Sequence, residues 1–294
     1  MKISTNTSFA GKLPLTVDER IAIVKEAGFD CYDLSFFTPA ILEEFKEDVD
    51  YREHARKIRA YADSIGIECN QAHAPFNGIY GVPDSELGFS ALVRCMEVSS
   101  LLGAKIIVIH PLQHLNYAEN AARLYEMNLI FYRKLLPYAE RFGIKIATEN
   151  MWQCNCGANV PTDSVCSRSS EFCRLVDELN SPYLVGCLDI GHVSLMGADI
   201  PAFIRAMGQK RLQALHVHDT DFIHDDHTLP YLRRIDFSAV TKALGEIDYQ
   251  GELTFEAANF FARFPRELYL PAARLMCETG RYLAREIDKS RPIV

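Results

Sequence analysis

Eight short β-prone runs recur along the chain of 294 residues, and a polar residue stands at the end of each one. The runs span residues 2–6, 31–35, 66–73, 104–110, 144–150, 184–189, 212–218 and 251–257. Their terminal polar residues are Asn6, Asp33, His73, His110, Glu149, Asp189, His216 and Glu256, which follow one another at intervals of 27 to 40 residues. Such an interval holds one strand and one helix. Eight units of this kind predict an α/β fold, a (β/α)8 TIM barrel that forms a single domain over residues 1–294.

Amphipathic stretches between these runs support the same fold. The helices that we predict include residues 16–28, 51–66, 85–103, 123–143 and 237–247. A glycine lies at or beside the end of each, where helices often terminate in left-handed backbone. These glycines are Gly28, Gly66, Gly103, Gly143 and Gly245. Regular alternation of strand and helix is typical of a parallel sheet covered by helices.

The charge balance and hydropathy limit the range of partners. The net charge of −8 disfavours nucleic acid, whose binding depends largely on cationic contacts to phosphate. No apolar run approaches the roughly 20 residues that cross a bilayer, and the first residues lack the apolar core of a secretion signal. We therefore expect a cytoplasmic protein without nucleic-acid or membrane partners, and a homo-oligomer stays open.

The nine cysteines are too scattered to suggest a disulfide framework. Cys154, Cys156, Cys166 and Cys173 are close enough in sequence to raise the question of a zinc site. However, a C-x-C pair followed by gaps of nine and six residues matches no strong zinc spacing. We predict free thiols.

The last four strand ends carry residues suited to a metal. In a TIM barrel all strands run in one direction, so their carboxyl ends meet at one face. Glu149, Asp189, His216 and Glu256 would then share one volume, with His218 close by. Two carboxylates 4 Å apart repel by about 4 kcal/mol at an effective dielectric of 20, and a divalent cation relieves that repulsion. Mixed carboxylate and imidazole donors suit Mn, Co, Zn, Fe or Mg.

Four motifs at these strand ends carry a family resemblance. "ATEN", "CLDIGH", "LHVHD" and "TFEA" resemble the sugar phosphate isomerase/epimerase superfamily of xylose isomerase-like TIM barrels, which includes endonuclease IV. The resemblance spans nearly the whole chain. It implies a divalent metal (Mn, Co, Zn or Mg) held by Glu149, Asp189, His216 and Glu256. Relatives differ in which histidine of "HVHD" they use; Asp219 favours His216, and His218 is the alternative.

The same resemblance gives two interpretations for further polar residues. His73, His110, His192, Asp225 and His227 correspond to the additional ligands of endonuclease IV, which holds three zinc ions. Alternatively these residues, with His218, line the pocket and form hydrogen bonds with a sugar. Trp152 and the aromatic residues Phe255, Phe260, Phe261 and Phe264 could stack on a sugar or belong to the core. We expect His54, His114 and His224 at the surface.

The function that the resemblance implies is a metal-dependent isomerase or epimerase that acts on a sugar or a sugar phosphate. Such enzymes remove a proton beside a carbonyl and pass through an enediolate. In ketose 3-epimerases two glutamates act on opposite faces of the carbon, which makes Glu149 and Glu256 the catalytic pair here. Asn155 departs from that pattern, since those epimerases place a substrate-binding Glu six residues after the first glutamate. The alternatives are an endonuclease IV-like phosphodiesterase, an inosose-type dehydratase and a non-catalytic sugar-binding barrel.

Overall fold

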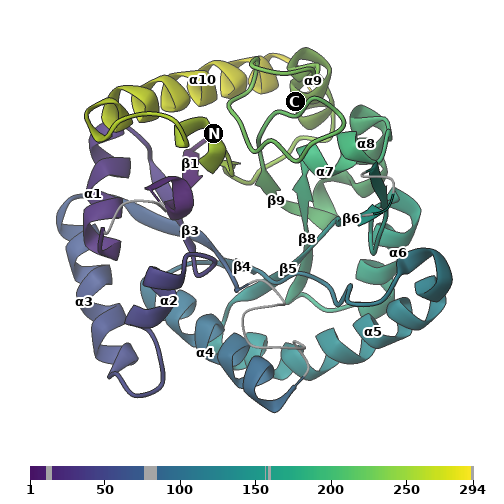
Figure 1. Cartoon of the computed structure of the whole chain (residues 1–294), viewed down its shortest axis with the longest axis horizontal. Coiled ribbons are helices and arrows are strands. Elements are labelled where there is room, and N and C mark those ends of the chain that lie inside the picture. Colours follow the sequence, from purple (N-terminus) through teal and green to yellow (C-terminus); the bar gives the residue numbers. More distant parts are fainter. Residues whose placement is uncertain (11–14, 76–84, 156, 158–159, 293–294) are drawn as a thin grey trace.

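The computed structural model describes residues 1–10, 15–75, 85–155, 157 and 160–292, and its centre is a parallel barrel (Figure 1). Eight strands pair in the order β10-β1-β2-β3-β4-β5-β8-β9. A parallel bridge between Val217 and Phe255 joins the two ends of this sheet. The predicted (β/α)8 barrel is confirmed. Its strands are β1 (Ile3–Asn6), β2 (Cys31–Ser35), β3 (Glu68–His73), β4 (Ile106–Val108), β5 (Lys145–Glu149), β8 (Leu184–Asp189), β9 (Leu212–His216) and β10 (Leu253–Phe255).

Helices form a ring around the strands (Figure 1). The α-helices are α1 (Val17–Ala27), α2 (Pro39–Glu44), α3 (Tyr51–Ser64), α4 (Glu86–Leu102), α5 (Tyr117–Phe142), α6 (Ser169–Leu179), α7 (Ile190–Leu195), α8 (Ile200–Arg211), α9 (Phe237–Glu246) and α10 (Tyr269–Lys289). Short 3-10 turns cover η1 (Thr7–Ala10), η2 (Ala258–Phe261) and η3 (Arg266–Leu268). In the described part of the chain, no helix has both the length and the apolar character needed to cross a bilayer.

Four of the five glycines that we predicted at helix ends lie just after the last residue of a helix. Gly28, Gly103 and Gly143 are left-handed C-caps, and Gly66 has a φ of +70° just beyond α3. Gly245 is different, because it lies inside α9 and has no positive φ. A Cβ there would lie 2.5 Å from the carbonyl oxygen of Ile287, so this glycine allows α10 to pack closely on α9. The prediction of a glycine cap was wrong at Gly245.

The inward-facing residues of four strands fill one side of the barrel with small apolar groups. Val108, Ala147, Cys187 and Ala214 belong to this inner cluster, which is separate from the larger core beneath the helices. Side chains two residues apart on a strand share a face. Glu149, Asp189 and His216 follow Ala147, Cys187 and Ala214 by two residues, and so continue these inward rows at the carboxyl end of the barrel.

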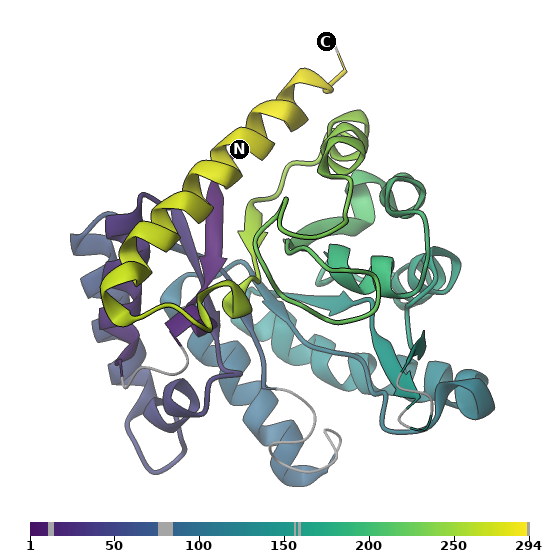
Figure 2. The same cartoon turned by 45° about the horizontal axis from the view of Figure 1, so that its top comes forward.

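A hairpin that we did not predict follows β5. Strands β6 (Trp152–Asn155) and β7 (Val160–Asp163) pair antiparallel, with Trp152 opposite Asp163. The hairpin lies outside the barrel sheet, beside the start of α5, where the backbone N–H of Tyr117 donates to Gln153 Oε1 (Figure 2). It interrupts the strand-helix repeat on the side where the strand ends converge.

Candidate metal and active site

Four of the strand-end residues meet at the centre of the barrel mouth. Each of Glu149, Asp189, His216 and Glu256 has a ligand atom within 4.8 Å of a ligand atom of the other three. The first three are fully buried and Glu256 is nearly so. The structure therefore brings together the four residues in which the sequence predicted a metal site.

The contacts within this group fit a cation better than direct hydrogen bonds. His216 Nδ1 lies 3.2 Å from both Glu149 Oε1 and Glu256 Oε2. Yet His216 Nδ1 and Glu149 Oε1 are buried and have no hydrogen-bond partner. Oxygen and nitrogen ligands that each bind an ion at about 2.0–2.2 Å come to lie roughly 3 Å apart. These buried atoms therefore have the chemistry and the spacing of ligands that converge on one ion.

The pKa shifts of Glu149 and His216 also indicate that this cluster of four residues needs a positive charge to balance its carboxylates. Burial favours the neutral carboxyl, but the neighbouring His216 and His110 outweigh it and hold the pKa of Glu149 well below its usual range. Burial likewise opposes an imidazolium at His216, but the surrounding acidic groups, among them Glu256 and Glu149, hold the pKa of His216 well above its usual range. A divalent cation would supply the same compensation as an imidazolium.

Cys187 is close to this group but is a poor ligand. It could form a cluster with Glu149 and His216. Burial raises the pKa of the Cys187 thiol to about 12, so it stays protonated near neutral pH. Because metals bind the thiolate, we assign Cys187 to the inner core.

His218 contacts the group from one side. Its Nε2 lies 3.0 Å from both carboxylate oxygens of Asp189, and its ring stacks on His227 at a centroid distance of 4.1 Å. His216, not His218, therefore belongs to the four-residue cluster. Gly191 makes this position possible, since a Cβ there would lie 2.0 Å from His218 Cε1.

A first flanking cluster shares Glu149. His110 Nε2 lies 3.1 Å from Glu149 Oε2, and His73 Nε2 lies 3.7 Å from the same oxygen. The Nδ1 of His73 bonds the carbonyl of Ala74 at 2.8 Å, which directs Nε2 towards the glutamate. Burial lowers the pKa of His110, which favours the neutral ring. Glu149 thus presents one oxygen to each of two clusters.

A second flanking cluster consists of His192, Asp225 and His227. Asp225 Oδ2 lies 3.0 Å from His227 Nε2 and 3.5 Å from His192 Nε2. Both imidazoles are oriented by backbone carbonyls, with His192 Nδ1 on Asn150 and His227 Nδ1 on Glu256, each at 2.8 Å. Burial opposes protonation of His227, but Asp225 outweighs it and raises the pKa of His227 to about 10.

These clusters surround a cavity of about 210 Å³. Trp152 borders it, and its Nε1 donates to Asp225 Oδ2 at 3.3 Å. Four lining residues were missed from the sequence: Phe37, Gln113, Met151 and Cys154. Gln113 and Met151 each lie within three residues of a predicted site residue, which is the only sequence signal for them. The full lining is Phe37, His73, His110, Gln113, Glu149, Met151, Trp152, Cys154, His192, Asp225, His227 and Glu256.

Other candidate residues lie elsewhere. Of the two alternatives for the aromatic residues, the core applies to Phe255 and Phe261, which are buried, while Phe260 and Phe264 pack against the core. His114 and His224 are exposed as predicted, and His54 is half-buried against Glu44.

The described cysteines are free thiols, as predicted. Among the described residues, no candidate metal cluster includes Cys154, Cys166 or Cys173. The fourth member of the proposed zinc run, Cys156, lies outside the described residues.

Comparison with known proteins identifies the family. The model of the xylose isomerase-like TIM barrel family matches residues 21–278, and the chain belongs to this family. Two curated relatives are each 26% identical to it: the uncharacterized protein y4fM of Sinorhizobium fredii over 172 residues, and the uncharacterized protein MJ1311 of Methanocaldococcus jannaschii over 196 residues. The chain spans 52% of the length of the first and 64% of the second.

Solved structures share the fold over nearly the whole chain. A D-tagatose 3-epimerase-like protein is 18% identical with a TM-score of 0.77, covering 98% of this chain and 99% of that one. The 3-keto-D-glucoside 4-epimerase YcjR of E. coli is 17% identical with a TM-score of 0.72, covering 94% and 98%. The IOLI protein with a bound zinc atom is 21% identical with a TM-score of 0.70, and both chains are covered completely.

Proposed function

We propose that this protein is a divalent-metal-dependent sugar isomerase or epimerase that removes and returns a proton beside a carbonyl group. The observation that carries the proposal is the convergence of Glu149, Asp189, His216 and Glu256, with buried donor atoms lacking hydrogen-bond partners, at the rim of a barrel. Active sites of TIM-barrel enzymes lie at this rim. The names of the similar structures, two sugar epimerases or epimerase-like proteins and a zinc-binding protein, support the same reaction class.

In this proposal the four residues hold one divalent metal, which is Mn, Co, Zn or Mg. When bound, it would act as a Lewis acid for negative charge that develops on the substrate oxygens. His218 positions Asp189 through its two contacts of 3.0 Å.

Glu149 and Glu256 are the proposed catalytic pair. Both border the cavity, and the pKa of Glu149, which is held well below its usual range, keeps this residue in the ionised form that a general base requires. Asn6 donates to Glu256 Oε1 at 3.4 Å, which orients that carboxylate towards the cavity. With a substrate carbon between them, one glutamate takes the proton and the other returns it to the opposite face, giving the epimer.

We assign the flanking residues to recognition of the sugar. His73, His110, His192, Asp225 and His227 line the cavity and would bind its hydroxyl groups. Trp152 borders the same cavity and offers a face on which the apolar side of the ring could stack. The partner is then a small sugar.

One observation favours a second candidate, a multi-metal phosphodiesterase. The two flanking clusters also have ligand spacing, and Glu149 is shared between two of the three groups. This candidate requires more than one metal per chain. The net charge of −8 weighs against a polyanionic substrate.

Isotope exchange and metal analysis test the proposal together. The metal-loaded protein is incubated in deuterated water with ketoses, aldoses, their phosphates, keto-glycosides and inosose, and solvent deuterium is expected at one carbon beside a carbonyl. About one metal per chain is expected. Two or three metals per chain, with cleavage of abasic-site DNA, would support the second candidate instead. Loss of water from inosose would indicate a dehydratase, and binding of a sugar without any exchange would indicate a non-catalytic barrel.

A further inference from the structure

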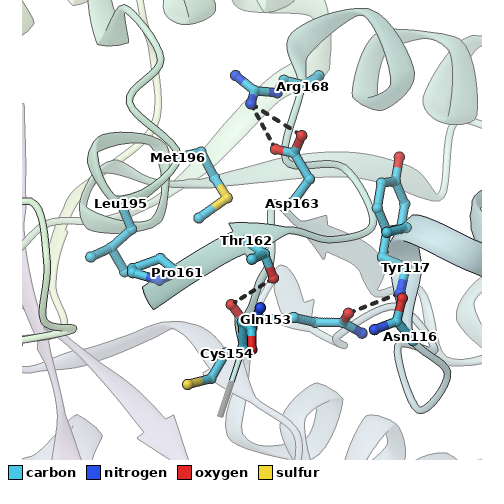
Figure 3. Close-up of a pocket in the computed structure, with 12 residues that line it drawn as sticks. Asn116, Tyr117, Gln153, Cys154, Pro161, Thr162, Asp163, Arg168, Leu195 and Met196 are labelled. Carbon is cyan, nitrogen blue, oxygen red and sulfur yellow. Dashed lines mark hydrogen bonds and ion pairs between the residues drawn. The ribbon is translucent and has the colours of Figure 1, made fainter. Parts of the chain in front are cut away.

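A second, larger pocket adjoins the metal cavity (Figure 3). Its volume is about 770 Å³, and it is lined by the β6–β7 hairpin, the start of α5 and the end of α7. Cys154 lines both this outer pocket and the metal cavity, so the two are neighbours across one strand of the hairpin. At about 210 Å³ the metal cavity alone is smaller than the about 300–1,000 Å³ typical of ligand sites. The outer pocket offers further space beside it.

Strand β6, which borders both spaces, is held by specific hydrogen bonds. Gln153 Nε2 donates to the carbonyls of Gln113 and Leu115 at 2.9 and 2.7 Å, and its Oε1 accepts from the backbone N–H of Tyr117 at 3.0 Å. Thr162 Oγ1 donates to the Gln153 carbonyl at 3.3 Å. Figure 3 shows Tyr117, Gln153 and Thr162 at the outer pocket. The hairpin is therefore tied to the barrel rim, which makes the outer pocket a built feature.

The lining combines apolar and polar groups without net charge. Pro161, Leu195 and Met196 supply apolar surface. Arg168 Nη2 lies 2.8 and 3.1 Å from the two oxygens of Asp163, so the cation is already compensated. An arginine has five N–H donors and a carboxylate about four acceptor sites, so the half-exposed pair can still bond other groups. Such a lining suits a neutral polyhydroxyl group better than a phosphate.

We infer that the substrate is a neutral two-part sugar, whose carbonyl-bearing unit enters the metal cavity while a glycosidically linked second unit occupies the outer pocket. This inference rests on the proposed function and narrows its substrate class. A sugar linked through its anomeric carbon is locked as an acetal, so its reactive carbonyl must be a ring ketone. A ketose that carries the second unit on another oxygen keeps its own carbonyl. Both kinds of substrate carry the second neutral unit that the outer pocket would bind.

Matched substrates test the inference. The panel contains D-fructose, D-fructose 6-phosphate, 4-O-glucosyl-D-fructose, a methyl 3-keto-glucoside, and a 3-keto-glucoside that carries a second neutral sugar unit on its anomeric oxygen. We expect kcat/KM to be at least about tenfold higher for one of the extended neutral substrates than for its short partner, since several contacts are added. Comparison of the two extended substrates shows whether the protein acts on the ring ketone or on the ketose that keeps its own carbonyl.

Two variants connect that preference to the outer pocket. Arg168→Ala is expected to lower kcat/KM for the extended substrate by about tenfold and for the short one by less than about threefold. Thr162→Trp, which places a β-compatible bulky residue in the pocket, is expected to do the same. Arg205→Ala is the matched control, because it also removes a half-exposed ion pair, with Glu246 at 2.7 Å, from a surface that does not line the pocket. It should leave the preference unchanged.

The outcomes separate this inference from the proposed function. Equal turnover of short and extended sugars, preference for the phosphate, or equal losses for both substrates in Arg168→Ala would overturn the inference alone. Dissociation of an oligomer by Arg168→Ala with an unchanged preference would also overturn it, by assigning the pocket to a subunit contact. Absence of exchange and turnover with every sugar, in metal-loaded protein, would overturn the proposed function and the inference with it.

Discussion

The two ends of the barrel handle charged side chains in different ways. At the carboxyl end, Glu149, Asp189 and His216 are fully buried and each contacts several other ionisable groups. At the amino end, two ion pairs stay in contact with water. Lys2 forms an ion pair with Glu68, and Arg281 forms one with Asp30. About a third or more of each of these four side chains is exposed.

This difference separates function from stability. Burial of charge is costly unless the group is paired or binds a metal, so a buried cluster of shared carboxylates and imidazoles indicates a binding site. Exposed pairs contribute at most about 1 kcal/mol each, and their loss is tolerated. Substitutions at the carboxyl end should therefore change metal binding and activity, whereas those at the amino end should change only the stability of the fold.

The largest effect is expected from Glu149→Gln and Glu256→Gln. Each removes a proposed acid or base, and kcat should fall by about 10²–10⁴-fold. Metal content must be measured in both, because each residue is also a proposed ligand. One of the two variants is expected to retain deuterium exchange at the carbon that the remaining glutamate reaches. Full turnover in both metal-loaded variants would contradict the two-glutamate mechanism.

Two glycine substitutions of similar steric severity should give opposite results. In Gly191→Ala the new Cβ would lie 2.0 Å from His218 Cε1, so His218 must leave Asp189. Loss of such a supporting contact typically weakens metal affinity about 10–100-fold. In Gly245→Ala the clash is 2.5 Å from the Ile287 carbonyl, where α9 packs on α10, and we expect a loss of about 1–3 kcal/mol of stability with metal affinity unchanged. Metal titration and thermal melting of both variants measure the contrast, and equal metal affinities would argue against the role of His218.

The barrel and the four-residue cluster could be predicted because both depend on the regular recurrence of strands along the chain. The polar strand ends recur at intervals of 27 to 40 residues, and parallel strands bring such ends to one rim. The choice between the two histidines of "HVHD" could not come from this rule alone. Ala214, His216 and His218 differ by steps of two and share the inward face, so only the depth of each along the barrel separates His216 from His218.

The outer pocket depends on contacts that the sequence does not display. The segment "WQCN" of β6 lacks the alternation of a half-buried strand, and β7 contains Pro161, which suits an edge strand. The side chain of Gln153 bonds groups 36 to 40 residues away. A single polar residue in a loop gives no signal of such long-range bonds. Strand alternation alone would have decided between the two alternatives for Phe255, since it precedes Glu256 by one residue and therefore faces the helices.

Metal binding at the carboxyl end should weaken as the pH falls. The acidic surroundings of His216, despite the opposing effect of burial, hold its pKa well above the usual value, so a proton competes with the metal for the ring. If one proton is displaced, the apparent Kd should rise by about tenfold for each unit of pH decrease. Competition with a metal-binding dye at pH 6, 7 and 8 measures this slope. A Kd independent of pH would mean that His216 is not a ligand.

The smallest effect is expected at the amino end, in Arg281→Gln. Burial raises the pKa of Asp30, but the hydrogen bond from Arg281, at 2.8 Å to Oδ1, outweighs it together with the backbone N–H of Ile3, and the net pKa is lowered. A carboxyl with a lowered folded-state pKa stabilises the fold above its unfolded pKa of about 3.9 and loses that contribution as the pH falls through the folded value. The variant should therefore be less stable than the wild type by about 1 kcal/mol or less at pH 7, with the difference shrinking below about pH 4. Thermal melting from pH 7 down to pH 3 checks the trend, and metal affinity and kcat should equal those of the wild type. A loss of metal binding in this variant would contradict the division between the two ends of the barrel, because Arg281 donates hydrogen bonds to Asp30 and to the Gly28 carbonyl at the amino end.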